Sequence, residues 1–237
     1  MVTLKSSLAF LVLAFALFLC FIMSTGDGSY DYFQFVQQWP PATCSLSRTP
    51  CYKPRPPQIF TIHGLWPSNY SNPKRPSNCR GSLFDSRKVY PQLRLNLKIS
   101  WPNVKSGNDT EFWESEWNKH GRCSEQTLNQ MQYFERSDEM WNSYNITEIL
   151  KKAQIVPNAT RTWKYSDILS PIKAATNTTP ILRCKPDPAQ SKSQPSQPKS
   201  PQKPQLLHEV VFCYDYHAKK QIDCNRTGCL NKDISFQ

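Results

Sequence analysis

The segment that organises this sequence is DTEFWESEWNKHGRCS, residues 109–124. Asp109 is a favoured N-cap residue, and residues 110–119 contain no Pro or Gly. Gly121 stands where a helix would end, because glycine readily adopts the left-handed conformation that closes helices. The sequence therefore predicts a short helix with Asp109 at its start.

Three ionisable side chains share one face of this predicted helix. At 3.6 residues per turn, Glu116 and Lys119 are neighbours, and His120 lies four positions beyond Glu116. An ordinary surface pair of Glu116 and His120 would leave the same pattern, because mixed charge is typical of a solvated helix face.

A second stretch makes a functional interpretation stronger. Residues 60–70 read FTIHGLWPSNY, in which apolar and polar residues alternate up to His63, and Gly and Pro follow. This pattern predicts a strand over residues 58–63 that ends at a turn, with His63 on its polar face.

Two histidines, a glutamate and a lysine suit proton transfer on a phosphate ester. One imidazole accepts a proton from the nucleophile and the other supplies one to the leaving group, while the lysine offsets the growing negative charge. The residues alone do not say which histidine is the acid. This chemistry needs no metal.

Residues 60–67, FTIHGLWP, and 112–124, FWESEWNKHGRCS, resemble the two active-site blocks of the ribonuclease T2 family of secreted, transferase-type ribonucleases. The similarity continues in YDYFQFVQQWPPATC at 30–44, ISWPNV at 99–104 and LLHEVVFCYDY at 206–216. Within that family the chain most resembles the plant stylar S-ribonucleases, which act in gametophytic self-incompatibility.

The resemblance implies a role for each residue of the two blocks. His63 would donate a proton to the leaving 5′-oxygen, and His120 would activate the ribose 2′-hydroxyl. Glu116 and Lys119 would steady the pentacovalent phosphate. The product would be a 2′,3′-cyclic phosphate and then, more slowly, a 3′-phosphate, with no cofactor and no metal. Attack by the 2′-hydroxyl would restrict cleavage to RNA.

The resemblance also implies residues that hold the bases of single-stranded RNA. These are Gln38, Asn103 and Phe112, which suit the amide hydrogen bonds and aromatic stacking that bind unpaired bases. The tryptophans are expected mostly to fill the core instead, because large aromatic side chains usually do.

Two positions depart from the family pattern. Ser115 stands where many relatives carry a third histidine, and Arg122 replaces a common threonine. Loss of that histidine need not abolish catalysis, because the acid, the base and the charge stabilisers remain. His208 and His217 are interpreted as bystanders.

The N-terminus predicts a signal peptide over residues 1–25. Lys5 precedes an apolar run over residues 8–23, and small residues follow. A transmembrane anchor is the alternative, but a charged stop-transfer flank is missing. The mature chain, residues 26–237, is then expected to be secreted and extracellular, with no membrane-bound form.

Removal of the signal peptide takes Cys20 and leaves eight cysteines, an even number that predicts four disulfides in a secreted chain. Eight cysteines allow 105 pairings. Zinc binding is the competing use, but the sequence has no CxxC spacing. The family resemblance implies the pairs Cys44 with Cys51, Cys79 with Cys123, Cys184 with Cys229, and Cys213 with Cys224.

Glycosylation and charge add to the picture of a secreted RNA-binding protein. The formal charge is +11 and the pI is near 9.3, which suits a polyanionic partner such as RNA, although solubility alone would also explain it. Six sequons predict a glycoprotein, and their asparagines are Asn69, Asn108, Asn145, Asn158, Asn177 and Asn225.

Element patterns predict one α+β domain with an antiparallel sheet packed with helices. Residues 185–205, rich in Pro, Ser, Gln and Lys, are expected to form a disordered or polyproline-like loop within that domain. The expected strands are 30–39, 58–63 and 206–216, and the expected helices are 86–99, 109–120 and 125–142.

Three functions fit these observations. The chain is an active RNA endonuclease, an inactive descendant that serves as a recognition or storage glycoprotein, or a signalling ribonuclease in self-incompatibility. The third function would add pollen-side recognition proteins of the F-box type as partners, with residues 68–80 as the recognition stretch. A monomer is expected in each case.

Overall fold

The computed structural model describes residues 28–72, 74–186, 205–226, 228–230 and 233–237. The predicted signal peptide and most of the predicted Pro-rich loop lie outside the described residues. No helix within the described part of the chain is both long and apolar enough to cross a membrane.

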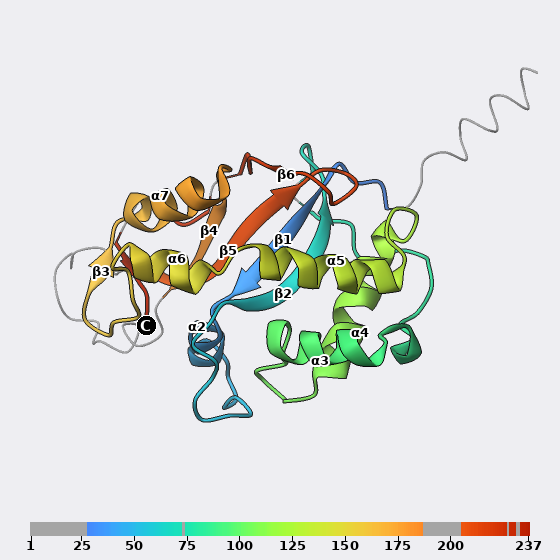
Figure 1. The fold of residues 1–237 in the computed structure, drawn as a ribbon, viewed down its shortest axis with the longest axis horizontal. Coiled ribbons are helices and arrows are strands. Elements are labelled where there is room, and N and C mark those ends of the chain that lie inside the picture. Colours follow the sequence, from blue (N-terminus) through green and yellow to red (C-terminus); the bar gives the residue numbers. More distant parts are fainter. Residues whose placement is uncertain (1–27, 73, 187–204, 227, 231–232) are drawn as a thin grey trace, which may run out of the picture.

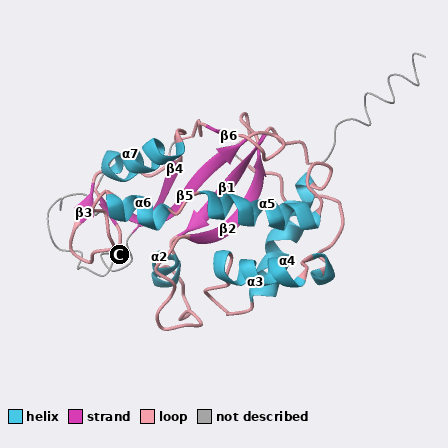
Figure 2. Ribbon diagram, viewed as in Figure 1, coloured by secondary structure: helices cyan, strands magenta, loops and turns pink. Residues whose placement is uncertain are grey.

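The chain forms one sheet with helices packed against it (Figures 1 and 2). The strands are β1 (Tyr32–Gln38), β2 (Thr61–Ser68), β3 (Thr162–Trp163), β4 (Ile181–Pro186), β5 (Gln205–Tyr214), β6 (Gln221–Ile222) and β7 (Ile234–Ser235). The α-helices are α2 (Pro40–Ser45), α3 (Pro91–Ser100), α4 (Asp109–Lys119), α5 (Gln130–Ser143), α6 (Ile146–Lys152) and α7 (Tyr165–Thr176), and the 3₁₀ turns are η1 (Ser86–Lys88) and η2 (Gly121–Ser124).

Within the described residues, one sheet joins all seven strands. Its main path runs β2-β1-β5-β7-β3, and β4 and β6 also pair with β5. Every pairing is antiparallel except that of β5 with β7, which is parallel. The predicted fold class is confirmed, and the sheet is mixed at this one position.

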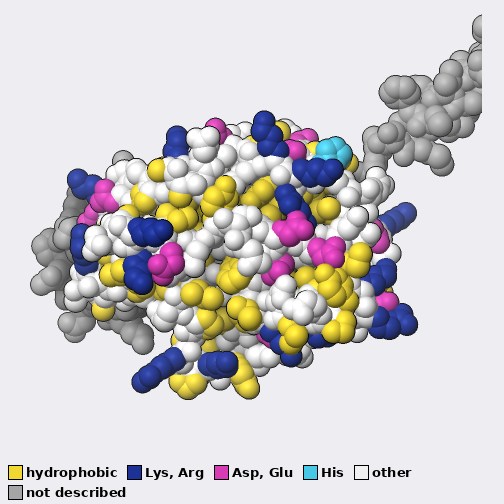
Figure 3. Space-filling view, in the orientation of Figure 1, with side chains coloured by type: hydrophobic (Ala, Val, Ile, Leu, Met, Phe, Trp, Pro, Cys, Tyr) yellow, Lys and Arg dark blue, Asp and Glu magenta, His cyan; other side chains and the backbone are white. Residues whose placement is uncertain are grey.

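One face of the sheet is covered by α5 and α6, which lie in front of the strands in Figure 1, and α7 packs beside α6. Phe33 and Phe35 of β1 and Phe212 of β5 pack with Phe134 of α5 and Leu150 of α6 in the main core. Over this side of the molecule, Lys and Arg are interspersed with acidic and apolar side chains (Figure 3). The apolar sides of these strands and helices are thus buried against each other on one face of the sheet.

The opposite face carries fewer apolar residues. Val36, Trp66, Ile181 and Val211 form a small separate cluster there. Polar side chains from the same strands share that face, because residues two apart in a strand point the same way. This is the face on which a site can be built.

Strand β2 does not end at His63 as predicted. It continues through Gly64 and Pro67 to Ser68, so the predicted turn at Gly and Pro is wrong. Strand β2 lies at the edge of the sheet, where a proline that lacks an N–H group is tolerated. Gly64 and Pro67 can therefore lie within β2, because in the described sheet no further strand forms hydrogen bonds with its outer edge.

Helix α4 matches its predicted range, but its N-cap is Asn108 and not Asp109. The Asn108 side chain accepts a hydrogen bond from the Glu111 N–H, while Asp109 Oδ1 accepts one from the Asn103 N–H at 2.7 Å. Asn108 and Asp109 could each have capped the helix. Asn108 does so, and Asp109 instead binds the backbone of the loop before α4. The helix predicted over 125–142 begins five residues later because Asn129 forms a capping box with Gln132.

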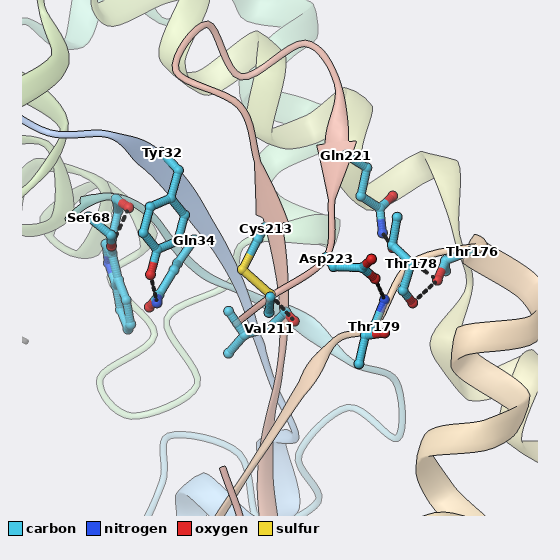
Figure 4. The surroundings of a disulfide bond; sticks show 12 residues. Tyr32, Gln34, Ser68, Thr176, Thr178, Thr179, Val211, Cys213, Gln221 and Asp223 are labelled. Carbon is cyan, nitrogen blue, oxygen red and sulfur yellow. Dashed lines mark hydrogen bonds between the residues drawn. A yellow bond between two sulfur atoms is a disulfide. The ribbon is translucent and has the colours of Figure 1, made fainter. Parts of the chain in front are cut away.

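All eight cysteines of the described residues are bonded, in the four pairs that the family resemblance implies. Cys79–Cys123 joins residues 44 apart and fastens η2, which follows α4, to the loop after β2. In the chain-entropy model such a loop closure is worth about 4 kcal/mol. Cys213–Cys224 ties β5 to the segment after β6, where the Cys224 Sγ also contacts the Val211 carbonyl (Figure 4).

Candidate active site

The four residues predicted to carry catalysis border one pocket of about 410 Å³. They are His63, Glu116, Lys119 and His120. The pocket lies between β2 and the C-terminal end of α4, and the loop after β2 covers it with Lys74 and Arg75. The fold therefore brings together segments that are far apart in the sequence.

His63 owes its direction to a bulge in β2. Along β1 the register passes from Val36, opposite Gly64, to Gln37, opposite Ile62, so His63 is an extra residue without an opposite partner. Bulges re-aim side chains, and they are common beside active sites. The bulge turns His63 toward the open face of the sheet.

On that face, His63 meets a buried carboxylate. Its Nδ1 lies 2.5 Å from Oε1 of Glu209, and Arg183 Nη1 donates to the other carboxylate oxygen at 3.2 Å. Burial alone would raise the pKa of Glu209, but these cationic and hydrogen-bonding neighbours hold it below its ordinary value. The ionised carboxylate holds the Nδ1 side of the ring, which leaves Nε2 free to act in the pocket.

Glu116 reaches β2 through a gap left by a glycine. Its Oε2 accepts a hydrogen bond from Trp66 Nε1 at 2.7 Å. A Cβ on Gly64 would collide with both of these atoms. Burial is the largest influence on Glu116 and raises its pKa, against the opposing effects of His63, Trp66 and nearby cations.

His120 is the C-cap of α4 and is almost fully buried. Burial, followed by the positive charges of Lys119 and Arg75, lowers its pKa to about 4, although the Pro76 backbone acts in the opposite direction. The imidazole is therefore neutral at neutral pH and can accept a proton.

Trp66 stands between the two histidines. Its ring centroid lies 5.1 Å from that of His63 and 5.4 Å from that of His120. Arg75 covers the ring, with its guanidinium carbon 4.0 Å from the centroid. Trp66 is buried, as predicted for most tryptophans, yet it also lines the pocket.

The three residues predicted to hold bases are not gathered in this pocket. Phe112 is the nearest, because its ring lies 6.0 Å from that of His63. Asn103 borders a separate pocket, and its amide is bonded within its own loop to Ser106 and the Asn108 carbonyl. Gln38 is buried at 3% exposure and accepts a hydrogen bond from Thr43.

Sequence reasoning missed two residues of the site. Glu209 lies within the apolar strand LLHEVVFCYDY. A carboxylate in such a strand indicates that a buried cationic or hydrogen-bonding partner faces it, so the sequence did contain a signal for Glu209. No such signal marks Arg75, which occupies a polar loop. His208, interpreted as a bystander, contacts Thr43 and lies 3.9 Å from Glu209, whereas His217 is exposed.

Other predicted sites lie on the surface. Five sequon asparagines are exposed, and Asn69 is half-buried with its amide donating to the Ser29 carbonyl at 2.9 Å. Among the residues that the structure describes, His, Cys, Asp and Glu side chains nowhere form a cluster that could hold a metal ion.

Comparison with known proteins gives a consistent result. A model of the Ribonuclease T2 family matches residues 30–224. Ribonuclease MC of Momordica charantia is 38% identical over 201 residues, which are 84% of this chain and 97% of that protein. Ribonuclease S-1 of Pyrus pyrifolia is 37% identical over 208 residues, which are 86% of this chain and 84% of that protein.

Solved structures of ribonucleases are also similar to this chain. The structure of ribonuclease MC1 from bitter gourd seeds has a TM-score of 0.76 at 38% identity and covers 87% of this chain and 100% of that chain. The structure of Japanese pear S3-RNase has a TM-score of 0.71 at 33% identity, with coverage of 87% and 100%.

Replacing Gly64 with alanine tests the packing of Glu116 against β2. The added methyl group should push Glu116 away from Trp66, and a displacement of about 1 Å in such a site can cost ~100-fold in rate. Steady-state RNA cleavage would measure the loss. Glu114→Gln, on the exposed side of the same helix, is the control and should cleave like wild type. Full activity in a folded Gly64→Ala protein would contradict this account of the contact.

Proposed function

The chain belongs to the ribonuclease T2 family, and we propose that its pocket cuts single-stranded RNA with His120 as the base and His63 as the acid. As a member it is an RNA endonuclease that acts through a cyclic phosphate intermediate. The observation that carries the residue assignment is the common pocket of His63, Glu116, Lys119 and His120, in which one histidine is kept neutral.

His120 begins the reaction. Its neutral ring accepts the proton of the ribose 2′-hydroxyl, whose oxygen then attacks the adjacent phosphorus. A base that is unprotonated across the neutral range is always ready for this step. The attack closes the 2′,3′-cyclic phosphate.

His63 completes the step. Nε2 of its ring delivers a proton to the 5′-oxygen as the bond from phosphorus to that oxygen breaks. Glu209 accepts a hydrogen bond from Nδ1 and so holds the ring with Nε2 available to donate. Water later opens the cyclic phosphate to a 3′-phosphate, and the two histidines exchange roles because the second step reverses the geometry of the first.

The charge that builds on the phosphate is offset by cations. Lys119 is exposed at the pocket, and Arg75 lies over Trp66 beside it. Glu116, held by Trp66, is positioned to contact the pentacovalent phosphate. A carboxyl group whose pKa is raised can donate a hydrogen bond to a phosphoryl oxygen while it is protonated.

The proposed biological role is that of a secreted stylar glycoprotein in self-incompatibility, which acts as the cytotoxic style-side determinant. The supporting observations are the identity to Pyrus S-ribonucleases, the signal peptide pattern and the sequons. The proposal extends to base contacts by Gln38, Asn103 and Phe112, and to a monomer that meets F-box type proteins of pollen. A ribonuclease outside the allelic series is the alternative, since Ribonuclease 1 of Arabidopsis thaliana is 35% identical.

Exchange of the histidines tests the catalytic proposal. His63→Asn and His120→Asn preserve size but remove proton transfer, so each should lower the rate of RNA cleavage at least ~100-fold. The double variant should lose less than the product of the two single losses. His217→Asn is the control and should cut normally. A folded His63 or His120 variant that retains most of its activity would show that the two-histidine assignment is wrong.

The pH profile tests the environment of His120. Because its pKa is lowered to about 4, the base stays neutral down to that pH, and kcat/KM should fall tenfold per pH unit only below it. The measurement uses a dinucleotide at constant ionic strength, in wild type and in Glu116→Gln, in which the carboxylate cannot contribute. An acid limb near the ordinary histidine value of 6.5 in both proteins would contradict the buried, neutral base.

A plant that carries the gene can test the biological role. Loss of the gene from the style should allow growth of pollen tubes that are otherwise rejected. Restoring wild type should restore rejection, whereas His63→Asn should not, because the role requires cleavage. Unchanged rejection in its absence, with ribonuclease activity intact in the purified protein, would favour the non-allelic alternative.

A further inference from the structure

A second cleft of about 510 Å³ adjoins the catalytic pocket. The two share His63, Trp66 and Arg75 as their common wall. The cleft runs from that wall across the open face of the sheet, over β1, β5 and β4. Its volume is within the range of sites that take small ligands or parts of polymers.

The lining of this cleft is strongly cationic. Arg183 and Lys185 come from β4, and Arg75 and Arg226 come from the two neighbouring loops. The carboxylate in the lining is that of Glu209, which is already bonded to His63 and Arg183. The positive charge of the cleft is therefore mostly uncompensated within the described residues.

Arg75 is the residue of this cleft whose hydrogen-bonding capacity is least used. Its Nη1 is buried and has no hydrogen-bond partner among the described residues. The guanidinium is held by stacking on Trp66, and burial together with the nearby Arg183 lowers its pKa to about 10, so it remains charged at neutral pH. A buried cationic donor without a partner is costly unless an anion completes it.

The other cations are built into the cleft to different degrees. Arg183 is fixed, because Nη2 donates to Gln34, whose own amide donates to the Tyr32 hydroxyl at 2.9 Å (Figure 4 shows the second bond). Arg226 uses Nη2 to hold the loop after β2 through the carbonyl of Asn72 at 2.9 Å. Lys185 is exposed at the end of β4.

We propose that this cleft is a phosphodiester subsite, in which Arg75, Arg183, Lys185 and Arg226 bind the backbone of the RNA strand beyond the bond being cut. Arg75 covers the ring of Trp66, so the cleft offers charge and bidentate donors more than a surface for stacking a base. Backbone contacts are sequence-independent. The subsite therefore favours longer strands of any sequence over dinucleotides.

This inference depends on the proposed function only in placing the cleaved bond in the catalytic pocket. The experiments below test the subsite separately from catalysis. Cleavage of an RNA dinucleotide and of an RNA hexanucleotide gives the ratio of their kcat/KM values. Wild type should favour the hexanucleotide, extended on at least one side of the cut bond. Lys185→Ala and Arg75→Gln should each lower this ratio, and Lys152→Ala, an exposed residue of α6 in neither cleft, should not change it.

Binding provides a readout that does not need cleavage. A DNA hexanucleotide has the phosphates but no 2′-hydroxyl, so its affinity can be titrated against salt. Removing one lysine or arginine that binds a phosphate should make the slope of log affinity against log salt less negative by about 0.7. Lys185→Ala should show this change and Lys152→Ala should not. Thermal unfolding of each variant shows that it is folded.

The outcomes are distinct. If wild type cuts neither RNA but binds the DNA hexanucleotide with the expected salt slopes, the catalytic proposal fails and the subsite stands. If it cuts both RNAs with equal kcat/KM, or if folded Lys185→Ala and Arg75→Gln proteins keep the wild-type ratio and slope, the subsite is wrong. Binding of an acidic peptide without length dependence on RNA would also overturn it in favour of a protein partner.

Discussion

The hydrogen bond from Trp66 Nε1 to Glu116 Oε2 is the contact on which the site depends. It joins strand β2 to helix α4, and these two elements carry the two histidines. The contact exists because Gly64 has no side chain in the gap. Cys79–Cys123 adds a covalent restraint at the end of the same helix. The strand and the helix are thus fixed by a polar bond, a glycine and a disulfide, and His63 and His120 meet in one pocket as a result.

The pKa values of the two buried carboxylates of the site, Glu209 and Glu116, are shifted in opposite directions. Glu209 has a histidine and an arginine within bonding distance, and its pKa is lowered. Glu116 has an indole N–H as its direct partner, and burial raises its pKa. Removing one partner of a buried ion pair is costly because the other charge is left uncompensated, so the Glu209 carboxylate depends on both His63 and Arg183. When the surroundings of two groups of the same type move their pKa values in opposite directions, one group can serve as an acid and the other stays ionised.

The sequence predicted what local rules control and missed what tertiary contacts decide. The range of α4, the α+β class and the convergence of four residues followed from capping residues, alternation and motif resemblance. The end of β2 did not, because Gly64 and Pro67 signal a turn and only the edge position of the strand lets it continue. The bulge at His63 and its bond to Glu209 depend on register between strands that are distant in sequence. No local pattern encodes that register.

The loop after β2 connects the site to the surface. Within it, Arg75 stacks on Trp66 and the Pro76 backbone influences His120, while Asn72, Lys74 and Ser77 are exposed. A change at Arg75 alters the charge at both clefts, and a change at Lys74 alters it at the catalytic pocket, whereas Asn72 lines neither. If this loop is the recognition stretch, its variation is constrained residue by residue. Residues that line a cleft, such as Arg75, would be held constant by the proposed RNA contacts, and an exposed residue outside both clefts, such as Asn72, would be free to vary.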